Sequence, residues 1–528
     1  MEPTGLAPFA PEVVLVGAAL LVFLLDTLKV RRNDLLGAIA ATAVAVALLA
    51  VVADLGFAPF AFARTIPASA VGGNPAGAIY AFTALGFVFQ AIFLLTAFLV
   101  ALASISRPND EPGSSIFYGL LLLATTGMLL VAVAGDLIFL LLAVEVTSIA
   151  TYLLVGYTRR DPRSLEAAMK FYIVGALSTA LSFFGASLLF GAFGTTSLAA
   201  LAQSAGGVAD PYLALAGFAF LVVGLGFKAT LVPFHAWAVD VYDGAPTEVS
   251  AFLAGGSKKV GVFAFFLVFI GPVIGLNVRA VACTGSCLAA TSFDPTIPFV
   301  LGVLAILTMT VGNVLALMQR EMKRMLAYSS ISQAGYMLIG IAVGSPAALA
   351  GATLQVFAHV FMKSGAFLVV AAAGGLGIGS AIDDYRGLGK RRPLLSVSFA
   401  LMLLGLAGIP LTVGFVSKFI LFSAAVHAEG FFVALAIAGL LNSALSVFYY
   451  ARVLKVMFLD PAPEPTPLPG ARIEGASGPP ALGTHGIGYA RGAAIALATV
   501  AIVALGIYPQ PVLAAIQSAA NGFYLTGP

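Results

Sequence analysis

Charged residues are scarce in this chain of 528 residues: only 9% are Asp, Glu, Lys or Arg, whereas 60% are hydrophobic. A soluble protein usually carries about 25% charged residues. The apolar runs are also too long and too many for the several soluble domains that the length alone would suggest. The composition therefore excludes a soluble globular protein and predicts an all-α polytopic membrane protein.

Cysteine is nearly absent as well. The two cysteines, Cys283 and Cys287, lie in the loop CTGSC. One pair cannot hold an iron–sulfur cluster, and no histidines flank it as a zinc site would need. The pair forms either a local disulfide or two free thiols, and the sequence leaves both open. Heme motifs, phosphate-binding loops, nucleophile elbows and nucleic-acid motifs are missing too, so nothing favours redox or hydrolytic chemistry in this chain.

The apolar runs predict about fourteen transmembrane helices, each near the length of about 20 residues that a bilayer requires. They cover residues 10–28, 35–53, 79–104, 116–133, 137–157, 168–193, 212–236, 249–271, 297–317, 325–344, 349–374, 394–426, 430–451 and 492–509. The seventh run meets Pro233, and the twelfth is interrupted by GIPLTVG. Because proline removes a helix hydrogen bond, both helices are predicted to be broken.

Basic residues are concentrated in one set of alternate loops. That set holds 18 of the 26 Lys and Arg residues, while the other set holds only Arg64 and Arg279. By the positive-inside rule the basic loops face the cytoplasm, which places both termini outside. The Pro- and Gly-rich stretch 459–491 has too few apolar residues to fold alone and is predicted to be an inside linker.

Several charged residues nevertheless lie inside the apolar runs. They are Glu145, Lys228, Lys258, Lys259, Lys363 and Lys418. Each charge would cost about 2.5–3.5 kcal/mol at the centre of a bilayer. Backbone groups freed by a helix break are tolerated where they meet protein or a watery cavity, so charges beside a break predict a polar pathway. The alternative is that the lysines lie at helix ends and reach the headgroups.

Histidines extend this pattern. Lys228 and His235 are seven residues apart, and His359 and Lys363 are four apart. Each pair is therefore predicted to share one helix face, the first pair about 10 Å apart. Because histidine titrates near neutral pH, both pairs suit a proton relay. The alternatives are a static ion pair at Glu145 that fixes helix packing and a structural histidine bonded to a loop carbonyl.

The two breaks also suggest an internal duplication. Lys228 precedes the break at Pro233, whereas Lys418 follows the break at Pro410. The two predicted spans cross the membrane in opposite directions. Broken helices at matching places in two halves mark the transport site of inverted-repeat transporters.

Long stretches of the chain resemble the antiporter-like proton-pumping subunits of respiratory complex I, most closely subunit N. They are PEVVLVGAALLVFLLD, EAAMKFYIVGALS, FKATLVPFHAWAVDVYDGAPTEVSAFLAGGSK, KRMLAYSSISQAGYMLIG and GLAGIPLTVGFVSKFILF. The resemblance implies two inverted five-helix repeats with broken seventh and twelfth helices. It divides the chain into a three-helix segment (1–115), the first repeat (116–271), the second repeat (297–458), the linker (459–491) and a last span with its tail (492–528).

The resemblance also assigns roles to single residues. It marks Glu145 as the fifth-span glutamate that modulates Lys228, the seventh-span lysine. Lys258 matches the eighth-span connecting lysine because it follows a serine, and Lys259 matches less well. Lys418 matches the terminal lysine of the twelfth span, where the sister subunits L and M have a carboxylate. The eleventh-span segment HVFMK looks more like the sister subunits and the multisubunit cation/proton antiporters.

The function implied by the resemblance is proton translocation driven by quinone reduction in partner subunits. The chain is then an enzyme only as part of an NADH:quinone oxidoreductase-type complex in the plasma membrane. Its partners are sister antiporter-like subunits and small membrane subunits. Quinone, flavin and iron–sulfur clusters are expected in those partners, with no cofactor or metal in this chain.

Other functions stay open at this point. One is a relative of complex I that takes electrons from a deazaflavin or ferredoxin, since the donor binds other subunits. Another is a subunit of a multisubunit cation/proton antiporter without a redox partner. The third is an assembly scaffold whose charges only lock helices together.

Overall fold

The computed structural model describes residues 7–30, 32–56, 78–109, 113–204, 210–270, 296–462 and 487–526. Within these ranges the chain is almost entirely helical. Cys283 and Cys287, the basic residues Arg64 and Arg279, and most of the predicted linker lie outside the described residues. The division of the chain into repeats at residues 115, 271, 297, 458 and 491 stays a prediction.

Thirteen helices in the described part are long and apolar enough to cross a membrane. Ten are continuous α-helices: α1 (Ala10–Thr27), α2 (Asn33–Asp54), α3 (Ala84–Ser104), α4 (Ser114–Ala132), α5 (Leu137–Val155), α6 (Pro162–Phe193), α8 (Pro211–Ala229), α13 (Thr296–Leu317), α14 (Met322–Val343) and α20 (Phe431–Phe458). Another, α21 (Tyr489–Ile507), lies near the end of the chain. The predicted spans are confirmed.

Two further spans contain π-helical turns. The first runs through α10 (Thr247–Phe252), η4 (Leu253–Ser257), α11 (Lys258–Phe265) and η5 (Phe266–Ile270). The second runs through α15 (Pro346–His359), η6 (Val360–Ser364) and α16 (Gly365–Gly375). The hydroxyl of Ser364 donates to the carbonyl of Ala251 at 2.9 Å and joins the two spans where they are widened. Such turns occur often at functional sites.

The two predicted breaks are present. Helix α8 ends at Ala229, and the chain resumes as α9 (Ala236–Gly244) after a turn that begins at Thr230, whose φ is 59°. In the twelfth span, α18 (Pro393–Ala407) stops before α19 (Val413–His427) begins. These two 15-residue halves form one interrupted span, so the total of about fourteen spans agrees with the sequence.

Aspartate caps begin several of these helices. The side chains of Asp136, Asp161 and Asp210 accept hydrogen bonds from the first N–H groups of α5, α6 and α8. Proline occupies the first position of α6 and α8, where its missing N–H costs nothing. Local sequence therefore fixes where each span enters the bundle.

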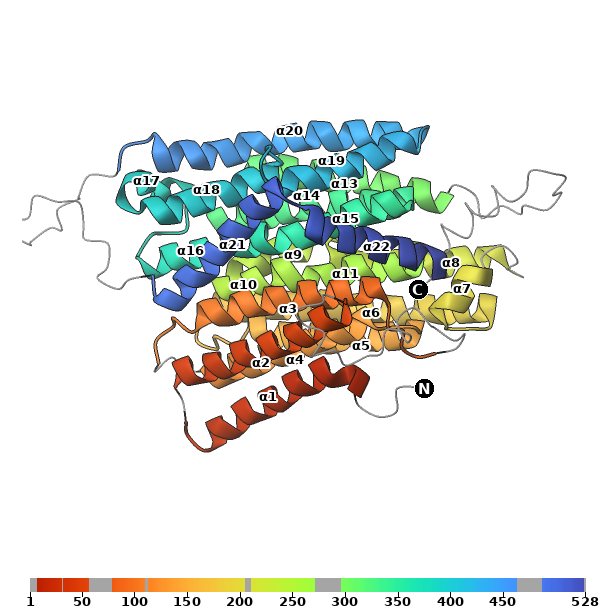
Figure 1. The fold of residues 1–528 in the computed structure, drawn as a ribbon, viewed down its shortest axis with the longest axis horizontal. Helices are drawn as coiled ribbons and strands as arrows, with labels where there is room; N and C mark the ends of the chain where they lie inside the picture. The colour runs from red at the N-terminus through yellow and green to blue at the C-terminus, as the bar shows by residue number, and fades with distance from the viewer. Residues whose placement is uncertain are drawn as a thin grey trace, which may run out of the picture.

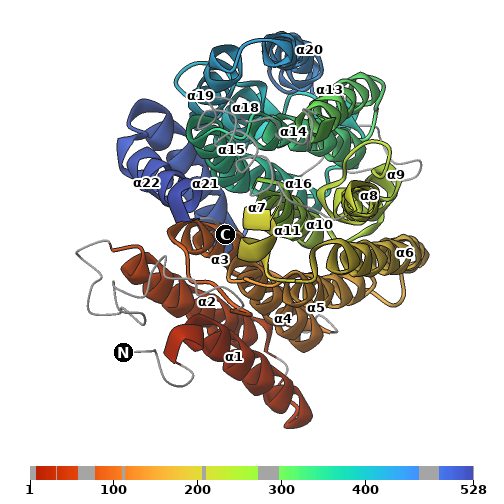
Figure 2. The same ribbon diagram turned by 90° about the vertical axis from the view of Figure 1, so that its right-hand side faces the viewer.

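The spans lie side by side, and Figure 2 shows most of them nearly end-on. Helices α1 and α2 lie at one edge of the bundle, while α13 and α20 lie at the opposite edge. Helix α1 ends and α2 begins at one end of the bundle, whereas α1 begins and α22 (Gln510–Thr526) ends toward the other end (Figure 1). The chain is thus a multi-pass helical bundle with the even number of crossings that the sequence predicts.

Several helices of the described chain lie outside the predicted spans. The short α7 (Leu198–Ser204) follows α6, and α22 (Gln510–Thr526) follows the last span. Figure 1 shows α21 and α22 crossing the front of the bundle in succession. Together they pack against α3 on one side and against α15 and α19 on the other. They therefore join the N-terminal helices to the second broken span.

Candidate functional site

A set of basic side chains is buried inside the bundle. Their exposed fractions lie between 0% and 3%, and they are Lys228, Lys258, Lys259, His359, Lys363 and Lys418. The alternative that these lysines reach the surface is therefore wrong for this structure. A buried amine in a membrane needs polar partners or water, so the neighbours of each amine decide what the set can do.

Lys228 on α8 is held by one hydrogen bond from the neighbouring α5. Its Nζ donates to Ser148 Oγ at 2.8 Å, and Ser148 in turn donates to the carbonyl of Val144 at 2.8 Å. The ring of Phe171 lies 6.0 Å away, at the limit of a cation–π contact. Lys228 thus depends on one side-chain hydroxyl.

Glu145 lies on α5, one turn before Ser148. Its half-buried carboxylate accepts a hydrogen bond of 2.7 Å from Thr179 Oγ1 on α6. No ion pair joins Glu145 to Lys228 in the described part of the chain. The predicted pairing is therefore indirect, because the carboxylate turns toward α6 while the amine is anchored on α5.

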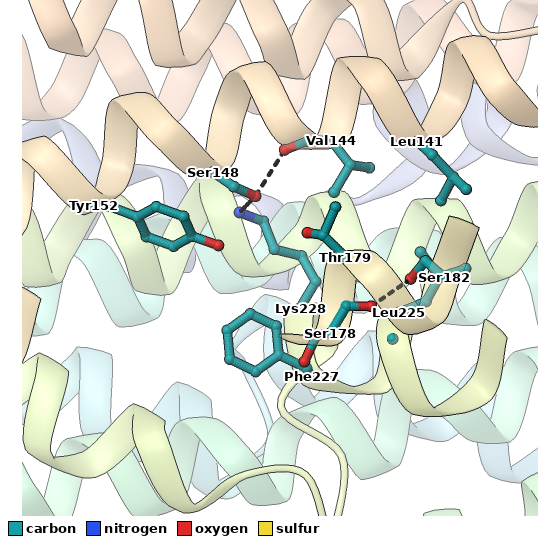
Figure 3. Close-up of a pocket in the computed structure, with 11 residues that line it drawn as sticks. Leu141, Val144, Ser148, Tyr152, Ser178, Thr179, Ser182, Leu225, Phe227 and Lys228 are labelled. Atoms are coloured by element: carbon teal, nitrogen blue, oxygen red, sulfur yellow. Dashed lines mark hydrogen bonds between the residues drawn. The ribbon is translucent and has the colours of Figure 1, made fainter. Parts of the chain in front are cut away.

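A small cavity lies between Lys228 and Thr179, the partner of Glu145. Its volume is about 20 Å³. Eleven residues line it, among them Lys228, Ser148, Thr179, Tyr152 and Gly224. This is room for about one water molecule, and the lining offers several polar partners for it. Figure 3 shows Lys228 reaching toward Ser148, with Tyr152 and Thr179 on either side. The cavity therefore connects the lysine with the threonine that holds Glu145.

The predicted shared face of Lys228 and His235 is wrong. Helix α8 ends at Ala229 and α9 begins only at Ala236, so no continuous helix joins the two residues. His235 instead lies at the start of α9, half-buried, with its Nδ1 buried and without a hydrogen-bond partner. His235 therefore lies where the break meets α9, and it does not share a helix with Lys228.

Ion pairs fix α9 at the basic end of the bundle. Asp240 accepts from Lys170 on α6 at 2.9 Å and from Arg324 on α14 at 3.2 Å. Burial alone would raise the pKa of the Asp240 carboxyl, but these two cations outweigh it and hold that pKa below its usual value. The network ties α6, α9 and α14 together next to His235.

Two of the buried lysines donate hydrogen bonds to residues near the centre of α14. Lys258 donates to the carbonyl of Ser330 at 2.8 Å and to its hydroxyl at 3.2 Å. Lys363 donates to the hydroxyl of the adjacent Ser329. The two lysines come from the two spans that carry π-helical turns. Adjacent serines on one helix therefore bring Lys258 and Lys363 together.

His359 is the next buried basic side chain of the set, beside these lysines. It is fully buried, and neither ring nitrogen has a hydrogen-bond partner. Its electrostatic neighbours are Lys259, Lys363 and Lys258. An imidazole without fixed partners in such a cluster is free to receive or release a proton at either nitrogen.

A chain of amides and hydroxyls continues toward the second break. Gln355 Nε2 donates to Gln333 Oε1 at 2.7 Å, and Gln333 Nε2 donates to the carbonyl of Leu406 at 3.1 Å. The hydroxyl of Ser417 donates to Gln355. Since Lys418 donates to the same carbonyl of Leu406 at 2.9 Å, this chain ends at the lysine of the twelfth span.

Lys418 has more partners than the other lysines. Its Nζ donates to the carbonyls of Leu406 and Ala407 at 2.9 and 3.0 Å and to Ser443 Oγ at 2.9 Å. The ring of Tyr336 lies 4.6 Å away. Gly408 has a φ of +87°, and a Cβ there would lie 2.9 Å from Lys418 Cδ. A glycine is needed at this place for the amine to reach the end of α18.

The sequence analysis did not identify the polar residues that link the lysines. They are Ser148, Thr179, Ser329, Ser330, Gln333, Gln355, Ser417 and Ser443. One signal was available: the run YSSISQ puts four polar side chains after a tyrosine inside the tenth span. Within the described residues, no group of three or more His, Cys, Asp and Glu is placed to hold a metal.

Comparisons with known proteins match most of this chain. Residues 134–446 match the family model described as NADH:quinone oxidoreductase/Mrp antiporter, TM. The chain is 38% identical to F(420)H(2) dehydrogenase subunit N of Methanosarcina mazei, over 97% of both chains. It is also 38% identical to NADH-quinone oxidoreductase subunit N 2 of Sorangium cellulosum, over 89% of this chain and 93% of that protein.

A solved structure supports the fold in three dimensions. A chain of respiratory complex I from Thermus thermophilus superimposes with a TM-score of 0.72 at 30% sequence identity. The match covers 96% of this chain and 99% of the other. The similarity therefore spans the breaks, the buried lysines and the terminal helices.

Proposed function

Because this chain belongs to the NADH:quinone oxidoreductase/Mrp antiporter transmembrane family, we propose that it translocates protons as a membrane subunit of a complex I-type oxidoreductase. Quinone reduction in partner subunits drives the transfer, and the flavin, iron–sulfur clusters and quinone belong to those partners. The observation that carries the proposal is the set of buried amines, imidazole, amides and hydroxyls that lies between the two helix breaks.

The proposed path begins at the basic end of the bundle. Protons enter near His235 and Lys228, pass Lys258 and the His359–Lys363 pair, and leave on the opposite side by Lys418. The segments 116–271 and 297–458 act as the entry half and the exit half. Each amine accepts a proton from the previous group and releases it to the next, so no redox step occurs in this chain.

Glu145 acts as the switch of this path. When its carboxylate approaches Lys228 across the cavity, it stabilises the protonated amine; when it stays with Thr179, the amine releases its proton more readily. Movement of charge in the partner subunits biases this choice. The reaction in the partners is thereby coupled to transfer in this chain by electrostatics.

The energetics favour a functional role over a purely structural one. Five charged groups at the depth of the bilayer centre would cost on the order of 15 kcal/mol if they were unpaired and dry. This sum is large beside the stability of about 5–15 kcal/mol of a typical domain. Apolar residues would pack the same helices at lower cost.

The location follows from the same reasoning. We place the protein in the plasma membrane, with its basic loops inside and both termini outside. Sister antiporter-like subunits and small membrane subunits are the proposed neighbours within the complex.

The proposal is tested by Lys228→Ala and Glu145→Ala in the purified complex. Both variants are expected to assemble and to reduce quinone, while proton uptake into proteoliposomes per quinone reduced is lost, because the entry amine or its switch is missing. Assembly is checked by the subunit pattern of the purified complex. Normal proton pumping by both variants would show that the mechanism is wrong.

A second candidate concerns the electron donor. One relative at 38% identity is F(420)H(2) dehydrogenase subunit N, so a deazaflavin-dependent complex is a candidate beside an NADH-dependent one. Supplying the native complex with reduced F420 or NADH and following flavin and iron–sulfur absorbance decides between these donors. A complex without either absorbance would favour a cation/proton antiporter instead.

The scaffold alternative is separated from both by charge removal. If the chain is only a scaffold, neutralising Lys228, Lys258 and Lys418 one at a time leaves proton transport by the complex unchanged. A proton pathway, in contrast, is interrupted by each change. Retained pumping in all three variants would favour the scaffold.

A further inference from the structure

Lys259 is a buried amine that the proposed path does not use. Its side chain is 0% exposed, and it is among the largest fully buried side chains of the described chain. Among the residues that the structure describes, its Nζ makes one polar contact, at 3.5 Å to the thioether sulfur of Met337. The adjacent Lys258, in contrast, donates to two oxygen atoms of Ser330. Two consecutive lysines therefore have very different surroundings.

The difference matters because thioether sulfur is a weak acceptor. The oxygen atoms of Ser330 solvate the ammonium form of Lys258, whereas Met337 gives the ammonium form of Lys259 almost no compensation. Packing does not require an amine here, since an apolar side chain of similar volume usually replaces a poorly compensated buried charge without loss of stability. A neutral amine in this place has an unshared electron pair that can accept a proton.

The position of Lys259 is favourable for a transfer step. Ser330, Gln333 and Met337 are spaced three and four residues apart on α14, so they form one stripe of that helix. Lys258 contacts the first of them and Lys259 the last, about 10 Å further along the helix. Between the two amines, Gln333 begins the amide chain that ends at Lys418.

His359 connects this stripe with the rest of the site. Lys259 is one of its electrostatic neighbours, together with Lys258 and Lys363. Both imidazole nitrogens are buried and unpartnered. The imidazole thus lies where it can exchange protons with the amines on either side.

We propose that Lys259 is a second proton-carrying amine of the eighth span, placed between His359 and the Gln333–Gln355 chain. The N–H bond of the His359 imidazolium breaks and an N–H bond forms at Lys259, whose proton then moves toward Lys418. This inference rests on the proposed function. It assigns the two consecutive lysines different steps: Lys258, beside Ser330, passes protons to the His359–Lys363 pair, and Lys259 carries them from His359 toward Lys418.

The test is Lys259→Met in the intact complex. Methionine keeps the length of the side chain and removes only the amine. Assembly and thermal stability are expected to stay equal or to improve, while protons moved per quinone reduced fall by about tenfold or more. The matched control is Met325→Leu, which changes a buried methionine of α14 twelve residues before Met337 and keeps the amine, and which should pump normally.

Two further variants protect the test against a folding defect. Lys259→His keeps an ionisable nitrogen, whereas Lys259→Gln is neutral and polar. The histidine variant is expected to retain part of the pumping with an altered pH profile, and the glutamine variant to lose it. Equal pumping by these two variants, or normal pumping by Lys259→Met, would overturn the inference.

The outcomes also separate this inference from the proposed function. If Lys259→Met pumps normally while Lys228→Ala does not, only the role of Lys259 is wrong. If the unaltered complex reduces quinone without moving protons, the proposed function itself is wrong. Loss of pumping in both variants, with assembly retained, supports both.

Discussion

Lys228 and Lys418 each lie beside a helix break, yet their amines are held differently. Lys418 donates to two backbone carbonyls and one hydroxyl. Lys228 donates to one hydroxyl. A carboxylate, Glu145, lies one turn from the partner of Lys228, while the partners of Lys418 are all neutral. The comparison is informative because the sequence predicts the two breaks to occupy matching places in two inverted repeats.

The direction of the chain at each break accounts for this difference. The last carbonyls of a helix lack partners within it and carry partial negative charge. Lys418 follows its break and folds back onto the carbonyls of Leu406 and Ala407 at the end of α18. Lys228 precedes its break, so its amine turns toward α5 instead. A fixed amine at one break and an adjustable amine at the other suit a terminal site and a switched site, respectively.

The largest expected effect comes from removing the hydroxyl partner of each lysine. Ser148→Ala leaves Lys228 without an oxygen acceptor, whereas Ser443→Ala leaves Lys418 with two carbonyls. A hydrogen bond to a charged group contributes about 1.5–3 kcal/mol. We therefore expect Ser148→Ala to lower the pumping rate about tenfold and Ser443→Ala to lower it much less.

The two serine variants are measured in the same assay of proton uptake by proteoliposomes. Each substitution removes a single hydroxyl group, so the variants serve as controls for each other. A loss in Ser443→Ala that equals or exceeds the loss in Ser148→Ala would show that the two lysines are held alike.

A smaller effect is expected when Glu145 is released from its present partner. Thr179→Val keeps the shape of the side chain but removes the hydroxyl that donates to Glu145 at 2.7 Å. The carboxylate is then free to approach Lys228 across the cavity and to hold the protonated amine. Because release of the proton becomes harder, turnover of pumping should fall about fivefold.

The control for this change is Ser182→Ala. Ser182 lines the same cavity, but its hydroxyl donates within its own helix, to the carbonyl of Ser178 at 3.0 Å. This variant should pump as the unaltered complex does. Turnover that is unchanged in Thr179→Val would mean that the contact between Glu145 and Thr179 does not control Lys228.

Hydropathy and charge predicted a large part of this structure. The spans, the two breaks and the depth of the lysines follow from local sequence, because a long apolar run with an internal proline and lysine has few stable arrangements in a membrane. The α22 helix was missed because its 17 residues include Gln510, Gln517 and Asn521 and resemble a polar tail.

Hydropathy and charge did not predict which side chains the lysines contact. Which side chain an amine meets depends on how each helix is rotated against its neighbours, and spacing along one helix does not determine this rotation. Glu145 therefore accepts a hydrogen bond from Thr179 and does not pair with Lys228. Because helix α8 ends at the break, Lys228 and His235 do not share the helix face that spacing predicted. The π-helical turn before Lys258 likewise changed the direction in which that lysine points.

The smallest expected effect concerns the aromatic ring at the fixed amine. Tyr336 lies with its ring centroid 4.6 Å from Lys418 Nζ, whereas Phe171 lies 6.0 Å from Lys228 Nζ. Tyr336→Leu removes a cation–π contact of about 1 kcal/mol and should lower the pumping rate by about two- to fivefold. Tyr336→Phe keeps the ring and should leave the rate unchanged in the same assay. If the two variants lose pumping equally, the hydroxyl of Tyr336 and not its ring supports Lys418, and the fixed site then depends on a polar side chain, as the Lys228 site does.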